Sequence, residues 1–346
     1  MKVGIVGGGQ LGRMLALAGI PLGMRFRFLE PSMSCPAAAL GEVIGTPYDD
    51  PEGLVRFAQN LSVATYEFEN VPTATVEFLQ QSLGVHPGAK SLQIAQDRIQ
   101  EKHFFKECGL GVQAFHAVGS SADLPRALEA VGPVGVLKTR RMGYDGKGQR
   151  VIRNGDSLES AWIALGKVPC IYEAFVEFER EVSIIGVRTR VGGKPQVAFY
   201  ELCQNEHVSG ILHQTVVPTP EGDRLTALAR EQAHAVMERL DHVGVLTIEF
   251  FAHGDTLTAN EMAPRVHNSG HWTIEGAQTS QFENHLRAIA GLPLGSTALR
   301  APCVMTNIVG TLPTTATVLS QPNAHLHLYG KAPRAGRKLG HITLVG

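Results

Sequence analysis

Two glutamates near residue 255 have the chemistry and the spacing to share a divalent cation. Glu249 and Glu261 lie in apolar segments on either side of residues 253–255, where we expect a hairpin turn. A three-residue turn pairs residue 249 with residue 259 and makes Glu261 a diagonal neighbour of Glu249 on the same face, at ~7–8 Å between Cα atoms. Two carboxylates at that spacing can hold Mg²⁺ together with phosphate oxygens. Asn260 faces the other side of a regular strand, so it joins them only at a bulge or a strand end.

The loop that follows concentrates groups that bind anions. It reads Arg-Val-His-Asn-Ser-Gly-His over residues 265–271. The guanidinium of Arg265 can stabilise an anionic intermediate through paired hydrogen bonds. Two histidines beside arginine, asparagine and serine on one short loop favour a functional site over isolated structural histidines.

A second anion-binding pattern lies in the middle of the chain. Residues 134–138 are strand-like and lead through Lys138 and two arginines to a glycine-rich loop over residues 143–148. The backbone N–H groups of such a loop can cover phosphates while a lysine neutralises their charge.

A third glycine-rich segment lies at the start of the chain and matches G-x-G-x-x-G over residues 7–12. It follows a predicted strand, and Glu30 ends the next strand. That is the dinucleotide-binding fingerprint in its expected context. On this segment alone an NAD-linked oxidoreductase is one hypothesis, although we expect the phosphate of some other ligand near this loop.

Each pattern also has a purely structural interpretation. The glutamates could be exposed strand residues, an interpretation that the apolar residues Ile248 and Phe250 disfavour. The loop at 143–148 could be a solvated basic turn, and the segment at 7–12 a tight turn between strand and helix.

Composition and charge exclude several classes of protein. The chain has 346 residues with 44% hydrophobic and 18% charged residues, a globular composition sufficient for two or three domains. Its net charge of −1 argues against a non-specific nucleic-acid binder. Residues 284–346 contain six Lys or Arg and no Asp or Glu, so they carry +6 and the first 283 residues carry −7. No long apolar segment or signal pattern appears at the N-terminus, and five separated cysteines indicate no disulfide framework or zinc site.

The elements that must position these residues differ along the chain. Strand-like and helical segments alternate over residues 1–95, which predicts an α/β unit with a mostly parallel sheet. Residues 96–291 mix short strands with helices, including an amphipathic helix over 223–240 and the hairpin around residue 254. Residues 292–346 contain short strand-like pieces.

Six motifs in order carry a resemblance to a known family. They are GGGQLGRM at 7–14, YEFENVP at 66–72, QDRIQEK at 96–102, GYDGKGQ at 143–149, NEMAPRVHNSGHWTIEG at 260–276 and GRKLGH at 336–341. The chain resembles ATP-grasp carboxylate–amine ligases, and within them the 5-(carboxyamino)imidazole ribonucleotide synthases of purine biosynthesis. This implies an α/β and α+β fold with a Rossmann-like pre-ATP-grasp domain (1–95), an ATP-grasp domain (96–291, with a lid at about 112–175) and a small β-rich C-terminal domain (292–346).

The resemblance also implies the reaction. ATP and bicarbonate carboxylate the exocyclic amine of 5-aminoimidazole ribonucleotide through carboxyphosphate, with Mg²⁺ and without biotin. Alternatives are another ATP-grasp ligase, of the formate-dependent ribonucleotide transformylase or biotin carboxylase type, an NAD-dependent oxidoreductase, and a nucleotide-binding regulator without turnover. We expect a cytoplasmic homodimer with neither a nucleic-acid nor a membrane partner.

Matching motifs assign roles to residues of this chain. Metal binding is implied for Glu249 and Glu261, and catalytic roles for Lys138, Arg265 and His267. The implied ATP-binding residues are Arg98, Lys138, Gly143, Tyr144, Asp145, Gly146, Lys147, Gly148, Gln149, Glu173, Ala174, Phe175, Val176, Glu181, His207, Asn260 and Glu261. The implied ribonucleotide contacts are Gln10, Leu11, Glu67, Tyr144, Asp145, Lys147, His267, Asn268, Lys331, Arg337 and Lys338.

Overall fold

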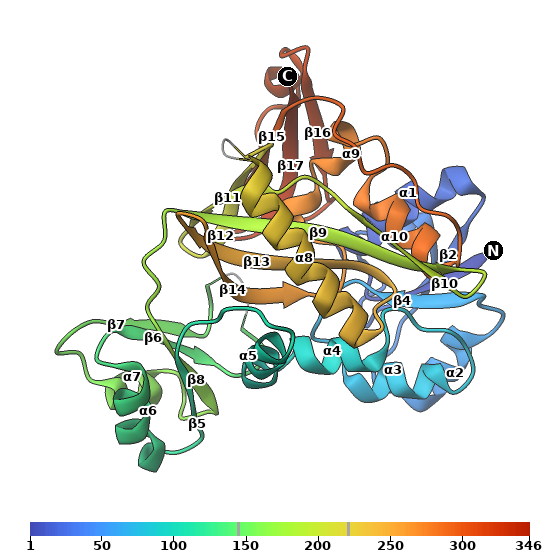
Figure 1. Cartoon of the computed structure of the whole chain (residues 1–346). Helices are drawn as coiled ribbons and strands as arrows, with labels where there is room; N and C mark the ends of the chain where they lie inside the picture. The colour runs from blue at the N-terminus through green and yellow to red at the C-terminus, as the bar shows by residue number, and fades with distance from the viewer. Residues whose placement is uncertain (144–145, 220–221) are drawn as a thin grey trace.

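The described part of the chain forms three β-sheets (Figure 1). Residues from all three regions line a common cavity. The computed structural model describes residues 1–143, 146–219 and 222–346. Within these residues no helix is both long enough and apolar enough to cross a membrane.

The first sheet is parallel throughout, as the alternation of strands and helices predicts. Its strand order is β3-β2-β1-β4, with helices connecting the strands. The elements are β1 Lys2–Val6, α1 Gln10–Gly19, β2 Arg25–Leu29, β3 Gly41–Ile44, α2 Pro51–Ala58, β4 Val63–Tyr66, α3 Thr73–Gln80 and α4 Ala89–Ala95.

The second sheet forms a separate small layer at the lower left of Figure 1. It is antiparallel with order β5-β8-β6-β7, and it follows helix α5 (Arg98–Glu107). Its elements are β5 Phe115–Val118, α6 Leu124–Val131, β6 Gly135–Thr139, β7 Gln149–Ile152, α7 Leu158–Ala164 and β8 Cys170–Ala174. We call residues 115–174 the lid sheet.

The third sheet is the largest and includes the C-terminal strands. Its order is β14-β13-β9-β11-β12-β15-β17-β16, with β10 paired to β9. The elements are β9 Arg180–Val191, β10 Lys194–Phe199, β11 Cys203–Val208, β12 Ile211–Val217, α8 Gly222–Leu240, β13 Gly244–His253, β14 Thr256–Ala263, α9 Thr273–Gly276, α10 Gln281–Ile289, β15 Cys303–Val309, α11 Thr315–Leu319, β16 Ala324–Leu328 and β17 Lys338–Val345. Because β12 pairs with β15, the β-rich C-terminal segment continues this sheet, which we call the large sheet.

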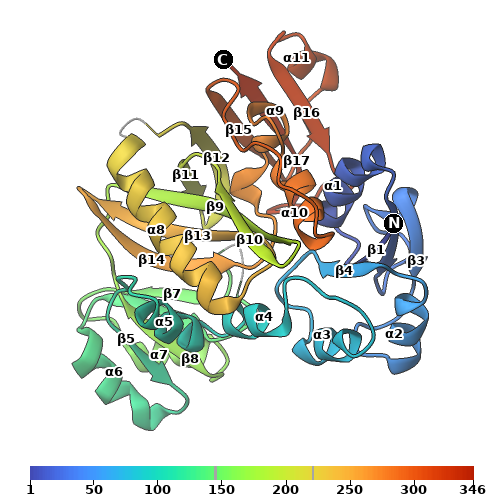
Figure 2. The ribbon, with the colours of Figure 1, turned by 45° about the vertical axis from the view of Figure 1, so that its right-hand side comes forward.

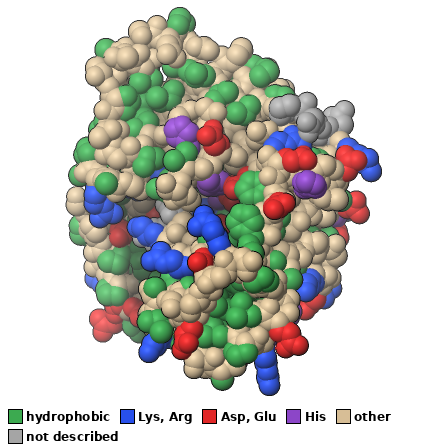
Figure 3. All heavy atoms as spheres, turned by 90° about the vertical axis from the view of Figure 1, so that its left-hand side faces the viewer, with side chains coloured by type: hydrophobic (Ala, Val, Ile, Leu, Met, Phe, Trp, Pro, Cys, Tyr) green, Lys and Arg blue, Asp and Glu red, His purple; other side chains and the backbone are tan. Residues whose placement is uncertain are grey.

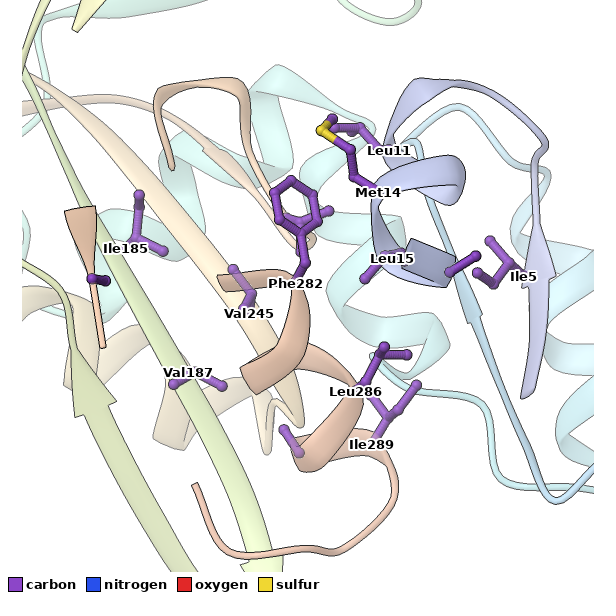
Figure 4. Close-up of a cluster of buried hydrophobic side chains, with 14 of the residues drawn as sticks. Ile5, Leu11, Met14, Leu15, Ile185, Val187, Val245, Phe282, Leu286 and Ile289 are labelled. Carbon is purple, nitrogen blue, oxygen red and sulfur yellow. The ribbon is translucent and has the colours of Figure 1, made fainter. Parts of the chain in front are cut away.

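Two helices cover opposite faces of the large sheet (Figure 2). Successive residues of a strand point to opposite faces, so Ile184 packs with α8 while Ile185 belongs to the cluster that contains α10. In that cluster Phe282 and Leu286 of α10 lie between the strands and Leu15 of α1 (Figure 4). The N-terminal sheet and the large sheet are therefore joined by a shared hydrophobic core.

Candidate functional site

A cavity of about 860 Å³ lies where the three sheets meet. Figure 3 shows Lys, Arg, Asp, Glu and His side chains gathered around a recess on this side of the molecule. The cavity is lined by most residues to which the motifs assign a role. These are Gln10, Leu11, Arg98, Lys138, Gly143, Gly146, Lys147, Gln149, Phe175, Glu181, His207, Glu249, Asn260, Glu261, Arg265, His267, Asn268, Lys331, Arg337 and Lys338.

Other assigned residues lie elsewhere. Glu67, Gly148, Glu173, Ala174 and Val176 are outside the set that lines the cavity. Tyr144 and Asp145, which we expect at both the nucleotide and the ribonucleotide, lie outside the described residues.

The paired glutamates lie closer together than the sequence predicts. Glu249 pairs directly with Glu261, because the hairpin has a two-residue turn between His253 and Thr256 and a register shift next to Glu249. The expected pairing of residue 249 with residue 259 is therefore wrong, since Ala259 pairs with Phe250. Asn260 is the extra residue of the bulge, and this bulge brings it to the cavity beside both carboxylates.

The two carboxylates differ in charge. Burial and the charge of Glu261 raise the pKa of Glu249 to about 7. Burial also disfavours the charged form of Glu261, but Arg98, which donates to its carboxylate at 2.8 Å, and Lys138 outweigh that effect and lower the pKa to about 2. The side chain of Glu261 remains 41% exposed because it faces the open cavity.

This donor set suits Mg²⁺. Two adjacent carboxylates repel each other, and a bound cation relieves that repulsion. Among the described residues no group of three or more His, Cys, Asp or Glu side chains forms a metal site by itself. In proteins, Mg²⁺ is usually held by one or two carboxylates together with phosphate oxygens and water.

Lys138 is held by a buried chain of charges. Its Nζ lies 2.6 Å from Glu173, whose other oxygen lies 3.6 Å from Lys102. Burial opposes the charge of Glu173, but the two lysines lower its pKa to about 2. The carboxylate of Glu173 is thus engaged with lysines, and Lys138 also donates to Asn260 Oδ1 at 3.4 Å.

His267 is neutral, and its ring N–H points to the carboxylate of Glu249. Burial, with the charges of Arg265 and Lys338, lowers the pKa of His267 to about 3. The N–H of Ser269 donates to Nδ1 of His267, so the ring proton belongs on Nε2, which lies 3.3 Å from the carboxylate of Glu249.

A buried series of hydrogen bonds fixes this orientation. Thr215 donates to Asn205 at 3.0 Å, and Asn205 donates to Ser183 at 2.9 Å. Ser183 donates to Ser269 at 2.8 Å, and Ser269 Oγ lies 2.9 Å from Nδ1 of His267. The orientation of the His267 ring, in the loop after β14, is thus determined by side chains of strands β9, β11 and β12.

Arg265 is oriented by a carboxylate of the N-terminal domain. Its Nε donates to Glu69, and Nη1 donates to the carbonyl of Val266 at 3.0 Å. Burial opposes the charge of Glu69, but Arg265 lowers its pKa. Asn268, which lines the same cavity, has a buried amide whose oxygen and nitrogen have no hydrogen-bond partner among the described residues. Such a side chain is suited to bind a ligand.

The N-terminal glycine loop is already occupied by protein carboxylates. Gly9 and Gly12 donate their backbone N–H groups to Glu67, the latter at 2.5 Å, and Gly8 donates to Glu30 at 3.0 Å. A Cβ at Gly9 would lie 2.5 Å from Glu67 Oε1. These amides are the groups that a pyrophosphate would need, so the dinucleotide interpretation of this loop is wrong.

The basic C-terminal segment forms one wall of the cavity. Lys331, Arg334, Arg337 and Lys338 line it, and Lys331 donates to Gln10 at the start of α1. The other basic residues of the segment lie elsewhere: Arg287 pairs with Glu283 on α10, and Arg300 donates to a backbone carbonyl.

Sequence reasoning missed several residues of the site. Glu69 stands in a quoted motif without a role, and its pairing with Arg265 joins positions 196 residues apart. Phe178 and Phe251 stack at 4.7 Å between ring centroids and line the cavity. The Phe-Phe pair at 250–251 was visible in the sequence, but only the pairing of β13 tells which ring faces the cavity.

Family descriptions match this chain in three consecutive parts. The ribonucleotide synthetase preATP-grasp domain matches residues 1–96, the ATP-grasp domain residues 103–282, and the phosphoribosylaminoimidazole carboxylase C-terminal domain residues 303–346. These matches confirm the expected fold class of a pre-ATP-grasp domain, an ATP-grasp domain and a C-terminal domain.

Named relatives match nearly the whole chain. The N5-carboxyaminoimidazole ribonucleotide synthase of Pseudomonas aeruginosa is 54% identical over 99% of this chain and 94% of its own length. The crystal structure of the synthetase from Thermus thermophilus superposes with a TM-score of 0.95 at 51% identity, covering 99% and 93%. The Aspergillus clavatus enzyme in complex with ADP and 5-aminoimidazole ribonucleotide superposes with a TM-score of 0.89 at 30% identity, covering 100% and 93%. The chain belongs to the N5-carboxyaminoimidazole ribonucleotide synthase family of ATP-grasp enzymes.

Proposed function

We propose that this protein carboxylates the exocyclic amine of 5-aminoimidazole ribonucleotide with ATP and bicarbonate, in purine biosynthesis. One observation carries the proposal: a single cavity is lined both by a carboxylate pair with a lysine and by a basic C-terminal wall. Phosphoryl transfer needs charge neutralisation at the nucleotide, and a ribonucleotide needs cations for its own phosphate.

Residues of the lid sheet and the large sheet would bind the nucleotide. Lys138 and Arg98 would neutralise phosphate charge, and the loop over residues 143–148 would cover the phosphates. The stacked rings of Phe178 and Phe251 offer an apolar surface for the base, while Glu181 would accept from the ribose. His207 pairs with Glu181, which raises the pKa of that histidine although burial opposes it.

Glu249 and Glu261 would hold Mg²⁺, with Asn260 beside them. When bound, the ion neutralises phosphate charge. Arg98 competes for the same carboxylate in this structure, so we expect the guanidinium to turn toward phosphate when nucleotide and metal bind.

The carboxylation would take place in the same cavity, next to the γ-phosphate of the nucleotide. Bicarbonate oxygen attacks the γ-phosphorus, the bond to ADP breaks, and carboxyphosphate forms. The amine nitrogen then bonds to the carboxyl carbon, directly or after release of CO₂, phosphate leaves, and one proton is released. Arg265, fixed by Glu69, would bind the anionic intermediate, and Asn268 and neutral His267 would contact the imidazole ribonucleotide.

The reaction is tested by measuring ADP release with purified protein. We expect release to need both bicarbonate and 5-aminoimidazole ribonucleotide, and ¹⁴C from bicarbonate to enter an acid-labile product. ADP release without bicarbonate in the presence of the ribonucleotide would contradict the assignment. Stimulation by formate would favour the transformylase alternative.

We further propose that the protein is a cytoplasmic homodimer, as the family resemblance implies. Sedimentation velocity at micromolar concentration would show a species of twice the 37.2 kDa chain mass, and a monomer at all concentrations would contradict it.

A further inference from the structure

The motif QDRIQEK has no assigned role beyond Arg98, yet its last two residues contact the strand that carries the metal-binding candidates. Strand β14 is the outermost strand of the large sheet, so the backbone groups on its outer side have no neighbouring strand to pair with. Buried backbone N–H and C=O groups need hydrogen-bond partners. In this protein side chains of α5 supply them.

The contacts lie on both sides of the bulge. Lys102 Nζ donates to the carbonyl of Asn260 at 2.6 Å and to that of Ala259 at 3.1 Å. Glu101 Oε1 accepts from the N–H of Met262 at 2.7 Å. Both side chains are buried, with Glu101 1% and Lys102 0% exposed. Over residues 259–262 two charged side chains thus take the place of a neighbouring strand, together with the carbonyl of Gly111, which accepts from the N–H of Ala259 at 2.8 Å.

The bulge decides which side chains reach the cavity. A two-residue turn without a bulge would pair Glu249 with Asn260 and turn Glu261 to the opposite face, because adjacent strand residues alternate. The extra residue pairs Glu249 with Glu261 instead. The hydrogen bonds from α5 match the bulged register, and a regular register would move the carbonyls that Lys102 binds.

The same face of α5 also contacts the carboxylate of Glu261. Arg98, Glu101 and Lys102 follow the i, i+3, i+4 spacing of one helix face. Arg98 binds the carboxylate of Glu261, while the other two hold its backbone neighbours. Phe105 anchors the helix in the core that contains α8.

We propose that Glu101 and Lys102 are positioning residues that hold the bulge at Asn260 and thereby set the spacing of the two carboxylates and the divalent-cation affinity of the site. The inference rests on the proposed function, because it takes Glu249 and Glu261 as the metal ligands.

Mn²⁺ binding to the full-length protein with saturating ADP, measured from the electron paramagnetic resonance signal of free Mn²⁺, tests the inference without turnover. We expect Lys102→Met to weaken Mn²⁺ binding about tenfold. Loss of a positive charge alone would strengthen cation binding. A purely electrostatic effect therefore predicts tighter Mn²⁺ binding in Lys102→Met, whereas loss of positioning predicts weaker binding. Lys106→Met removes the same charge from an exposed position of α5, and its Mn²⁺ affinity should remain within twofold of wild type.

Glu101 provides a second comparison that is independent of Lys102. Glu101→Gln keeps an oxygen acceptor for the N–H of Met262, whereas Glu101→Leu removes it. We expect Glu101→Gln to stay within twofold of wild type and Glu101→Leu to weaken Mn²⁺ binding about tenfold.

The outcomes separate this inference from the proposed function. Unchanged or tighter Mn²⁺ binding in folded Lys102→Met overturns it, as does a Glu101→Gln protein that loses tenfold or more. Glu261→Gln tests the metal site itself. If that variant binds Mn²⁺ like wild type, the metal assignment fails; if it weakens binding while Lys102→Met does not, only the positioning role fails.

Discussion

At the scale of single residues, the cavity side chains are held by partners that fix their charge or direction. His267 is kept neutral with its proton on Nε2, and Arg265 is directed by Glu69. The two carboxylates have opposite pKa shifts because Arg98 lies against only one of them. A site prepared in this way needs little reorganisation when charge develops during the reaction.

Lys338 should contribute binding without contributing to chemistry. It begins β17 at the basic wall of the cavity, where it would contact the ribonucleotide phosphate in all states of the reaction. Lys338→Ala should raise the KM for 5-aminoimidazole ribonucleotide about tenfold and leave kcat within twofold, since uniform binding affects KM alone. Steady-state kinetics at saturating ATP and bicarbonate measures this.

Arg300→Ala is the matched control for Lys338, because it removes a basic side chain of the same segment outside the cavity. Its kinetics should be those of wild type. A variant of Lys338 that raises the KM for ATP and not the KM for the ribonucleotide would place this lysine at the nucleotide.

At the scale of elements, Asp97 connects the lid sheet to helix α5. Its side chain accepts from the N–H groups of Ile99 and Gln100 at the start of the helix, and it pairs with Arg140 at 2.7 Å and Arg141 at 3.0 Å just after β6. Burial opposes the charge of Asp97, but Arg140 lowers its pKa. The loop over residues 143–148 therefore begins from an anchored base.

Asp97→Ala should loosen this anchor. Loss of the helix cap alone costs about 1 kcal/mol in the free energy of unfolding. Because Arg140 and Arg141 would lose their partner, we also expect faster amide hydrogen exchange in residues 140–152 and a higher KM for ATP. Asp123→Ala removes another capping aspartate of the lid, away from the cavity, and should leave the KM for ATP unchanged. Equal effects of both substitutions on ATP binding would contradict a specific role for Asp97.

The sequence predicted elements better than it predicted their lateral contacts. The amphipathic pattern over residues 223–240 placed α8 within one residue, because a local pattern determines such an element. The sequence allowed either a bulge or a strand end at Asn260 and could not decide between them, since the side chains of α5 that hold the bulge lie more than 150 residues earlier. Likewise G-x-G-x-x-G identified a tight turn correctly, but its occupant, Glu67, comes from the end of β4 and has no local signal.

At the scale of the whole molecule, a buried histidine joins the N-terminal sheet to the large sheet. His285 of α10 accepts from the N–H of Val245 on β13 at 3.1 Å, so its Nε2 proton points to Thr65 on β4 at 2.8 Å. Burial, with the nearby His242 and His86, lowers the pKa of His285 to about 3. Protonation would remove the acceptor for Val245 and place a charge between the sheets.

Acid should therefore destabilise the fold through this histidine. Between pH 6 and pH 4 the unfolded chain takes up a proton here while the folded protein does not, so the free energy of unfolding falls as the pH falls. His285→Gln should destabilise the protein at pH 7.5 but reduce the slope of that free energy against pH by about 1.4 kcal/mol per unit. Urea denaturation at several pH values measures both effects.

The exposed His213 is the control, because His213→Gln should leave the slope unchanged. A His285→Gln protein with the wild-type slope would show that this histidine does not carry the acid sensitivity.

The pairing of β12 with β15 fixes where the basic wall lies relative to the metal-binding candidates. Glu249 on β13 and Lys338 on β17 belong to one sheet and are connected through adjacent hydrogen-bonded strands. A paired sheet resists stretching along its hydrogen bonds, so the position of the basic wall relative to the metal-binding candidates is set when the chain folds. On the proposed function, the fold therefore selects its substrate by size: the reacting amine and the 5′-phosphate must reach their two sets of residues at once. A riboside without its phosphate would lack the contact with the basic wall.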